Sequence, residues 1–200
     1  MINNYEVAYN EEWNKLRLLD LEDISDRLGV VYDTYNNQMI VTYFKEDYIL
    51  DIDTRKIRKK EDDSNLHIIE SISLLNYLTY SNNKIFASEK WVSLKEIPGG
   101  GALFYPAFYK SSIKPLIDRF NNKINELENN SIKLQGTSIK MGDVAYEFEV
   151  LPKIKIGIVY WQGDEEISSN ATVLFQESIK DLVHIETVIG IGGIVVDKLI

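Results

Sequence analysis

Apolar residues recur at helical spacing in several parts of the chain and predict helices there. Asn10, followed by two acidic residues, predicts the start of a short helix that carries Trp13 and Leu16 on its buried face. Asp20 predicts the N-cap of a second helix, and Gly29 supplies the left-handed residue that ends it.

Three longer helices are predicted further along the chain. Ser64 is expected to cap a helix of about four turns, and Ser112 to begin one that tolerates Pro115 in its first turn and ends at residues 129–130. A last helix is predicted over residues 184–199. The apolar stripes of the first two are Ile68, Ile69, Ile72, Leu75 and Leu78, and Leu116, Ile117, Phe120, Ile124 and Leu127.

Alternating apolar and polar residues predict antiparallel strands on either side of these helices. Residues 30–59 read as a meander of about three or four short strands separated by turn residues. Residues 144–150 and 153–161 predict a hairpin, and residues 171–175 a third strand. One register puts apolar residues on one face and ion pairs on the other: Phe148 opposite Ile154, Tyr146 opposite Ile156, Glu149 opposite Lys153 and Glu147 opposite Lys155.

These elements predict an α+β fold, in which antiparallel sheets pack with about four to five helices. We expect residues 1–200 to form a single compact unit. Residues 1–81 and 111–200 are candidate subdomains, joined by an irregular region over 82–110 that has no clear period. A loop of that length in a compact domain suggests a functional role.

The charge balance argues against nucleic-acid binding. The chain has 31 acidic and 22 basic side chains, which gives a net charge of −9. The one basic cluster, over residues 55–60, is followed at once by the acidic residues 61–63, which cancel most of its field. We therefore expect no nucleic-acid partner.

Several further classes of protein are excluded or disfavoured. The absence of Cys excludes disulfides, thiolate nucleophiles, Cys-ligated Fe–S clusters and Cys-ligated zinc. The first residues show neither the basic start nor the apolar stretch of a secretory signal, and the apolar run 188–196 is roughly half the length needed to cross a bilayer. A cytoplasmic protein without a membrane partner is expected.

Nucleotide and metal motifs are weak in this sequence. There is no Walker A motif, and the glycines at 190–193 lack a preceding strand, so helix packing is the better interpretation of that set. His67 and His184 do not form a metal-binding spacing, and capping or solvation explains both, with His184 the better candidate ligand. Glu147 and Glu149 resemble a catalytic carboxylate pair, but the predicted register makes them exposed ion pairs.

Two segments of unusual composition are candidate sites. In the first, Trp161 precedes three consecutive acids, Asp164, Glu165 and Glu166, where a buried strand reaches the surface. These carboxylates could bind Mg²⁺, Ca²⁺ or a cationic ligand, or form an acidic surface turn. In the second, the glycine-rich segment after Pro98 allows close approach of a ligand, or serves as a structural turn. Its candidate binding residues are Gly99 and Gly100, walled by Trp91 and Tyr105.

The order of several short motifs resembles the prokaryotic domain-of-unknown-function family 3786. The matching pieces are Trp91-Val92-Ser93, Glu96-Ile97-Pro98-Gly99-Gly100, Phe104-Tyr105, Phe108, Gly142-Asp143, Leu151-Pro152, Trp161 to Glu166 and Leu174-Phe175. The likeness spans roughly Asp20 to the C-terminus.

This resemblance implies no catalytic residues, because the family is functionally uncharacterised. Its occurrence in anaerobic bacteria and archaea, with Fe–S segments in some members, implies a link to redox or corrinoid metabolism. A chain without Cys could have that link only through a partner.

Three functions remain open at this point. The leading hypothesis is a module that binds a small molecule or a partner protein in one cavity formed by the loops 98–105 and 161–166. The second is a metal-assisted enzyme of hydrolase type, with residues 164–166 as oxygen ligands and His184 as the base. The third is an assembly protein without a pocket.

Overall fold

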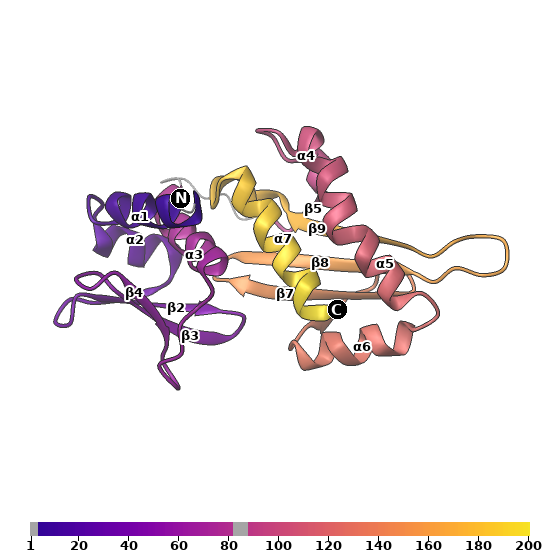
Figure 1. Cartoon of the computed structure of the whole chain (residues 1–200), viewed down its shortest axis with the longest axis horizontal. Helices are drawn as coiled ribbons and strands as arrows, with labels where there is room; N and C mark the ends of the chain where they lie inside the picture. Colours follow the sequence, from indigo (N-terminus) through magenta and orange to yellow (C-terminus); the bar gives the residue numbers. More distant parts are fainter. Residues whose placement is uncertain (1–3, 82–87) are drawn as a thin grey trace.

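The computed structural model describes residues 4–81 and 88–200, and it is an α+β protein built around two antiparallel sheets. The N-terminal part contains helices α1 (Asn4–Leu16), α2 (Leu21–Leu28) and α3 (Ile68–Tyr80) with the four-stranded sheet (Figure 1). The C-terminal part contains the five-stranded sheet with α4 to α7. No helix in the described ranges is both long and apolar enough to cross a membrane.

The four-stranded sheet is the predicted meander. Its strands β1 (Val31–Asp33), β2 (Gln38–Tyr43), β3 (Glu46–Asp51) and β4 (Lys56–Lys59) pair in sequence order. The reversals between them use residues with positive φ, namely Asn37, Lys45 and Arg55. The alternating burial of β2 puts Met39, Val41 and Tyr43 on the core side.

Helix ends follow local capping chemistry, with two corrections to the expected starts. The prediction that Asn10 begins the first helix is wrong, because α1 begins at Asn4 and Asn10 lies inside it, where its side chain donates to the Glu6 carbonyl. Asp20 accepts hydrogen bonds from the Glu22 and Asp23 backbone N–H groups, both at 3.1 Å, and Gly29 ends α2 at φ 72°, as predicted. The prediction that Ser64 caps the next helix is wrong. The Ser64 side chain and N–H donate to Asp62 in a turn, and His67 caps α3 instead.

The five-stranded sheet has the order β5-β9-β8-β7-β6. It contains the predicted hairpin, β7 (Val144–Leu151) with β8 (Ile154–Trp161), and the predicted third strand, β9 (Asn170–Gln176). The short strands β5 (Trp91–Ser93) and β6 (Thr137–Ser138) form its edges.

The predicted register of the hairpin is wrong by two residues. Phe148 lies opposite Ile156 and Glu149 opposite Lys155, because the chain reverses in a two-residue turn in which Lys153 adopts φ 65°. A bulge between Glu149 and Leu151 shifts the pairing of the two strands further. The ion pair between Glu147 and Lys155 forms at 2.7 Å, but diagonally across the strands.

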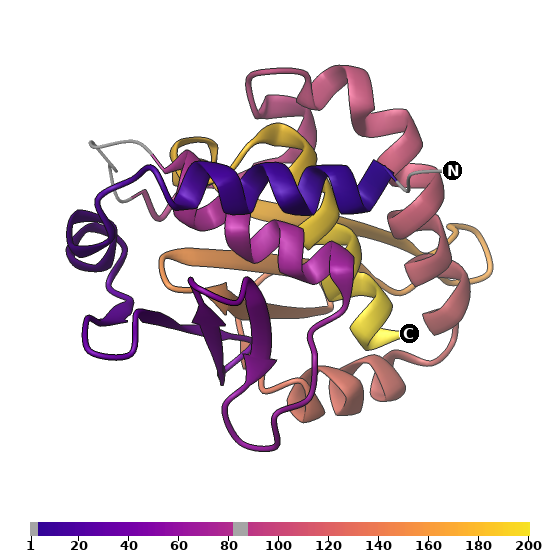
Figure 2. The same cartoon turned by 60° about the vertical axis from the view of Figure 1, so that its left-hand side comes forward.

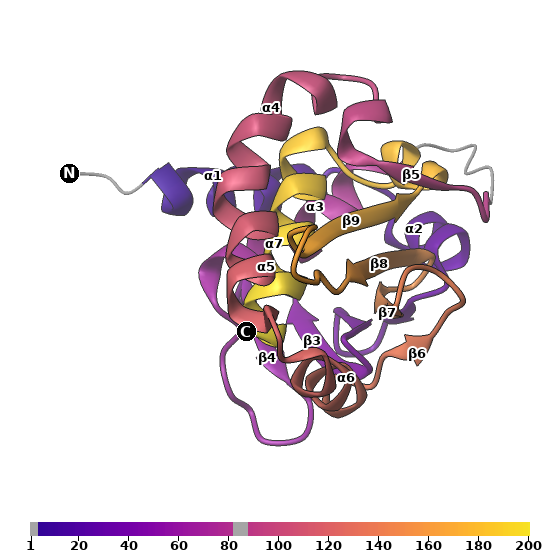
Figure 3. The ribbon, with the colours of Figure 1, turned by 90° about the vertical axis from the view of Figure 1, so that its right-hand side faces the viewer.

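Helices α4 (Gly101–Phe108), α5 (Lys114–Phe120) and α7 (Ile185–Leu199) lie on one side of the five-stranded sheet (Figure 3). A π-helical turn of five residues, Tyr109–Ile113, joins α4 to α5, and the Lys114 N–H donates to the Tyr109 carbonyl across it. The next helix, α6 (Ile124–Lys133), follows a sharp turn.

Two expectations for this part of the chain are corrected. The described portion of the irregular region, 88–110, contains β5, a 3-10 helix (Leu94–Glu96) and α4. The helix expected from Ser112 to residues 129–130 is two helices, since Asn121 leaves helical geometry at ψ 122° and Asn122 takes φ 59°.

One hydrophobic core joins the two parts of the molecule. Helix α1 lies across α3, and α3 packs against α7 (Figure 2). Trp13 on α1 and Tyr77 on α3 are both completely buried. The Tyr77 hydroxyl donates to the Pro152 carbonyl at 2.6 Å, which ties α3 to the turn between β7 and β8.

Candidate functional site

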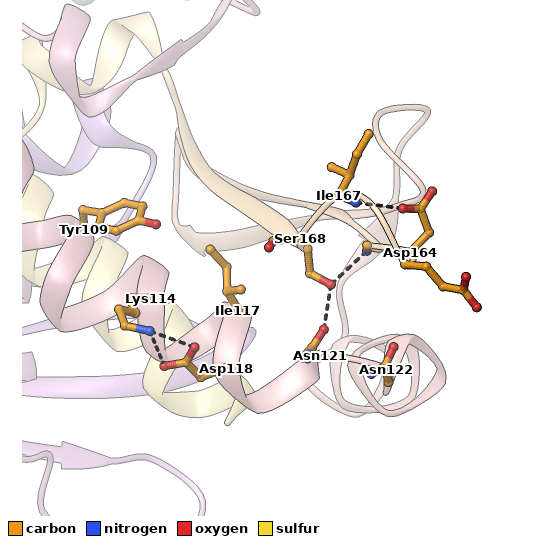
Figure 4. A pocket seen from close by; sticks show the side chains of 12 residues that line it. Tyr109, Lys114, Ile117, Asp118, Asn121, Asn122, Asp164, Ile167 and Ser168 are labelled. Atoms are coloured by element: carbon orange, nitrogen blue, oxygen red, sulfur yellow. Dashed lines mark hydrogen bonds and ion pairs between the residues drawn. The ribbon is translucent and has the colours of Figure 1, made fainter.

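A groove of about 860 Å³ lies between helix α5 and the loop 162–169 that connects β8 to β9 (Figure 4). We call it the α5 groove. Its polar lining consists of Lys114, Asp118, Asn121, Asn122, Asp164, Glu165, Ser168 and Ser169, and its apolar lining of Ile117 and Ile167, with Tyr109 at one end.

Asp164 shapes the loop side of the α5 groove. Its Oδ1 accepts hydrogen bonds from the Glu166 N–H at 2.9 Å and the Ile167 N–H at 2.8 Å. These backbone donors lower the pKa of the Asp164 carboxyl below its ordinary value of 3.8. The carboxylate is therefore both a turn former and a permanent negative charge at neutral pH.

Hydrogen bonds fix the base of the loop to the turn after α5. The Ser169 hydroxyl donates to Asn121 Oδ1 at 2.9 Å and accepts from the Gly163 N–H at 2.9 Å. Gln162 Nε2 donates to Asn122 Oδ1 at 3.0 Å. These contacts hold the two walls of the groove at a set separation.

The charges of the α5 groove are unevenly paired. Lys114 and Asp118 form an ion pair at 2.8 Å on the α5 wall, and the hydrogen bonds that the Lys114 ammonium donates to Asp118 raise the pKa of Lys114. On the loop wall, the carboxylates of Asp164 and Glu165 have no ion-pair partner among the described residues. The groove thus carries net negative charge on one side.

The apolar residues of the groove would suit the carbon skeleton of a ligand. Ile117 is half-buried on the α5 wall, and Ile167 is 69% exposed on the loop. Tyr109 is partly exposed where the π-helical turn begins. The combination of amide, hydroxyl and carboxylate groups with these surfaces can hold a polar molecule by hydrogen bonds and charge.

The predicted single cavity does not form, because the two candidate loops line different cavities. Gly99 and His184 line a separate cavity of about 260 Å³, together with Tyr80. There His184 Nδ1 accepts a hydrogen bond from the Glu186 N–H at 3.4 Å and caps α7. The capping interpretation of this histidine is confirmed.

The other candidate binding residues lie outside the α5 groove, and several of them have packing contacts. The Trp91 ring lies against Gly157 of β8, and Tyr105 lies with its ring centroid 4.1 Å from the Lys95 ammonium. Gly100 precedes α4 with φ 125°. Trp161, 39% exposed, and Glu166 are outside the lining of the α5 groove.

The acids of the loop do not converge as metal ligands. Within residues 4–81 and 88–200, no group of three or more His, Cys, Asp or Glu side chains is arranged to hold a metal ion. The hydrolase hypothesis required residues 164–166 to act together with His184, which lines the other cavity.

Sequence reasoning missed the α5 side of the groove. The sequence predicts one continuous helix here, and its apolar stripe indicates only the buried face. The groove is lined by residues outside that stripe: Lys114, Asp118, Asn121 and Asn122. The signal that could have found them is the Asn121-Asn122 pair directly after the buried Phe120, because Asn favours helix ends and left-handed geometry.

Comparison with known proteins identifies a family. No curated protein and no solved structure matches the chain. The family model described as Domain of unknown function (DUF3786) matches residues 20–198, in agreement with the resemblance carried by the short motifs. Because this match covers nearly the whole chain, the protein belongs to the DUF3786 family.

Proposed function

We propose that the protein is a binding module whose α5 groove takes a small polar molecule carrying positive charge. The observation that carries the proposal is the groove of about 860 Å³ with two carboxylates, Asp164 and Glu165, unpaired among the described residues. Its volume falls within the range of about 300 to 1,000 Å³ that is usual for small-ligand sites.

The chemistry of the lining supports a cation with hydrogen-bonding groups. Lys114 and Asp118 neutralise each other, so the loop carboxylates decide the local field. The net charge of −9 on the chain adds to the attraction at long range. Asn122 and Ser168 offer neutral hydrogen-bonding groups to the rest of the ligand.

The cellular context stays a prediction from the sequence and the family. A cytoplasmic location and a role in anaerobic redox or corrinoid metabolism are both compatible with a cysteine-free binding module that acts beside a redox partner. The metal-assisted hydrolase hypothesis has lost its ligand set among the described residues, and we do not favour it.

Three probes of equal length test the proposal: putrescine, 1,4-butanediol and succinate, which share four carbons but differ in charge. Each is titrated into the ¹⁵N-labelled protein. We expect putrescine to shift the amide signals of Glu165, Ser168 and Ser169 saturably. Butanediol is expected to bind weakly, and succinate to leave these signals unchanged, since two carboxylates face the groove.

A pair of neighbouring glutamates provides the matched control. Glu165 lines the groove, whereas the exposed Glu166 side chain does not. Glu165→Gln should weaken putrescine binding about two- to fivefold, in the range of one exposed ion pair. Glu166→Gln should bind like the wild type. Equal binding of putrescine and succinate, equal effects of the two substitutions, or no saturable shift would each refute the proposal.

A further inference from the structure

A second groove, remote from the acidic loop, lies between α3, α7 and the π-helical turn. We call it the α7 groove. It has a volume of about 670 Å³, and the first turn of α1 borders it. Its lining comes from both parts of the molecule: Ile69 on α3, Ser111 and Ser112 on the π-helical turn, and Gly190, Gly193 and Asp197 on α7.

The glycines of α7 differ in whether close packing requires them to lack a side chain. A Cβ at Gly192 would lie 2.9 Å from Phe175 Cζ and 3.0 Å from Phe108 Cζ, so close packing against the core requires that glycine. A Cβ at Gly190 or Gly193 would meet only serine hydroxyls, at 3.8 Å and 3.5 Å, which are ordinary contacts. Glycine is the least favourable helix residue after proline, so α7 carries two destabilising residues that its packing does not require.

These two glycines form the floor of the α7 groove. A side chain at either position would fill part of the cavity. Residues that lower the stability of their own helix without a packing reason are expected at functional sites, where a binding surface is kept at a cost in stability. The two glycines therefore indicate that the groove itself has a function, because their lack of side chains keeps it open.

A buried hydroxyl faces the same floor. Ser112 is 5% exposed, and its Oγ is the nearest atom to a Cβ built on Gly193. Its only hydrogen bond within the described chain is a 3.4 Å contact with Ser111 Oγ. Since a buried polar group normally has a good partner, the Ser112 hydroxyl is placed to bond a ligand in the groove.

The walls and the charge define the ligand. Ile69, Ile189 and Ile194 are half-buried along the groove and offer apolar surface. At its end the Lys198 ammonium is paired with Glu70 at 3.0 Å. The Asp197 carboxylate, in contrast, has no ion pair among the described residues. The lining thus combines apolar surface with the polar groups of His67, Ser111 and Ser112, and among the described residues it carries one negative charge without an ion pair.

We infer that the α7 groove binds an amphipathic small molecule, with an unbranched apolar chain and one amine. The chain lies over Gly190 and Gly193 between the isoleucines, and the ammonium group faces Asp197. This site shares no lining residue with the α5 groove, so either proposal can fail without the other.

Three eight-carbon probes test the inference: octylammonium, 1-octanol and octanoate, each kept below its micelle concentration. We expect octylammonium to shift the amides of Ser112, Gly190 and Gly193 saturably while leaving Ser168 unchanged. Octanol should bind more weakly, and octanoate most weakly. Asp197→Asn should weaken octylammonium binding about two- to fivefold and leave octanol binding unchanged. Glu186→Gln, on the same helix but outside the groove, is the matched control.

Substitution of the glycines separates binding from folding. Gly190→Ala and Gly193→Ala should raise the melting temperature and weaken binding of all three probes, whereas Gly192→Ala should lower the melting temperature. The inference is overturned if octylammonium does not bind saturably, if octanoate binds as tightly, or if both alanine variants bind octylammonium like the wild type.

Discussion

At the scale of single residues, glycine is required for different reasons at the three consecutive positions where α4 begins. Gly99 has φ 85° and open space around it, so only its backbone conformation favours glycine. Gly100 has φ 125°, and a Cβ there would lie 2.9 Å from the Phe104 ring. At Gly101 a Cβ would lie 1.9 Å from the Leu94 carbonyl oxygen, which only a backbone shift could relieve. The glycine-rich segment is therefore a packing device.

Replacing Gly101 tests this interpretation. Gly101→Ala should cost about 3 kcal/mol or more of unfolding free energy, because the new methyl group overlaps backbone at a buried helix start. Gly99→Ala should cost about 1 to 2 kcal/mol, since only φ is strained. Urea denaturation of both variants makes the comparison. Similar losses of unfolding free energy in the two variants would contradict this interpretation, because they would show that the backbone at the start of α4 can shift to accommodate a methyl group.

Asp164 should make the conformation of its loop depend on pH. Its hydrogen bonds to Glu166 and Ile167 lower its pKa below 3.8, so the carboxylate form stabilises the folded loop. That stabilisation is complete above pH 3.8 and is lost as the pH falls through the lower folded-state pKa. In an NMR titration, the Glu166 and Ile167 amide signals should move with a midpoint below 3.8. Asp164→Asn should abolish the movement; its persistence would assign the titration to another acid.

At the scale of elements, the π-helical turn keeps α4 and α5 in phase with the core. Phe108, Ile113 and Leu116 are all buried, and the five-residue turn begins directly after Phe108 and ends at Ile113. It also ends two residues before Pro115, whose ring would clash in a regular α-helix with the carbonyl four residues earlier. The wider turn thus satisfies both the apolar spacing and the proline.

Deletion of Lys110 tests these two roles together. Without it, Phe108 and Ile113 regain α-helical spacing, so the core stays in phase, but Pro115 then lies inside a regular helix. We expect the deletion to lose about 3 kcal/mol of unfolding free energy, and Pro115→Ala in the same chain to restore most of it. Urea denaturation measures both. A deletion variant that Pro115→Ala does not rescue would show that the turn has another cause.

At the scale of the whole molecule, features set by neighbouring residues were predictable from the sequence. Asp20 and Gly29 bound a helix by side-chain and backbone chemistry that needs no tertiary contact. The meander over residues 30–59 also follows from local alternation and turn residues. His184 begins the last helix where its pattern starts.

Features set by distant contacts, or by a backbone conformation that the residue type does not favour, were not predictable. The hairpin register depends on a two-residue turn with Lys153 at positive φ, which residue preference does not indicate. Strand β5 is recognisable only by its pairing with β9. Half of the candidate site was likewise missed, because the α5 groove joins the predicted acidic loop to a helix far away in sequence.

The order of strands in the two sheets also has a consequence for the time course of folding. Each strand of the four-stranded sheet pairs with its neighbour in sequence, so short loop closures suffice to build it. Strand β5 instead pairs with β9, although α4, α5, α6 and three strands separate them along the chain. We therefore expect the meander to form early and β5 to join late, when Trp91 comes to rest over Gly157.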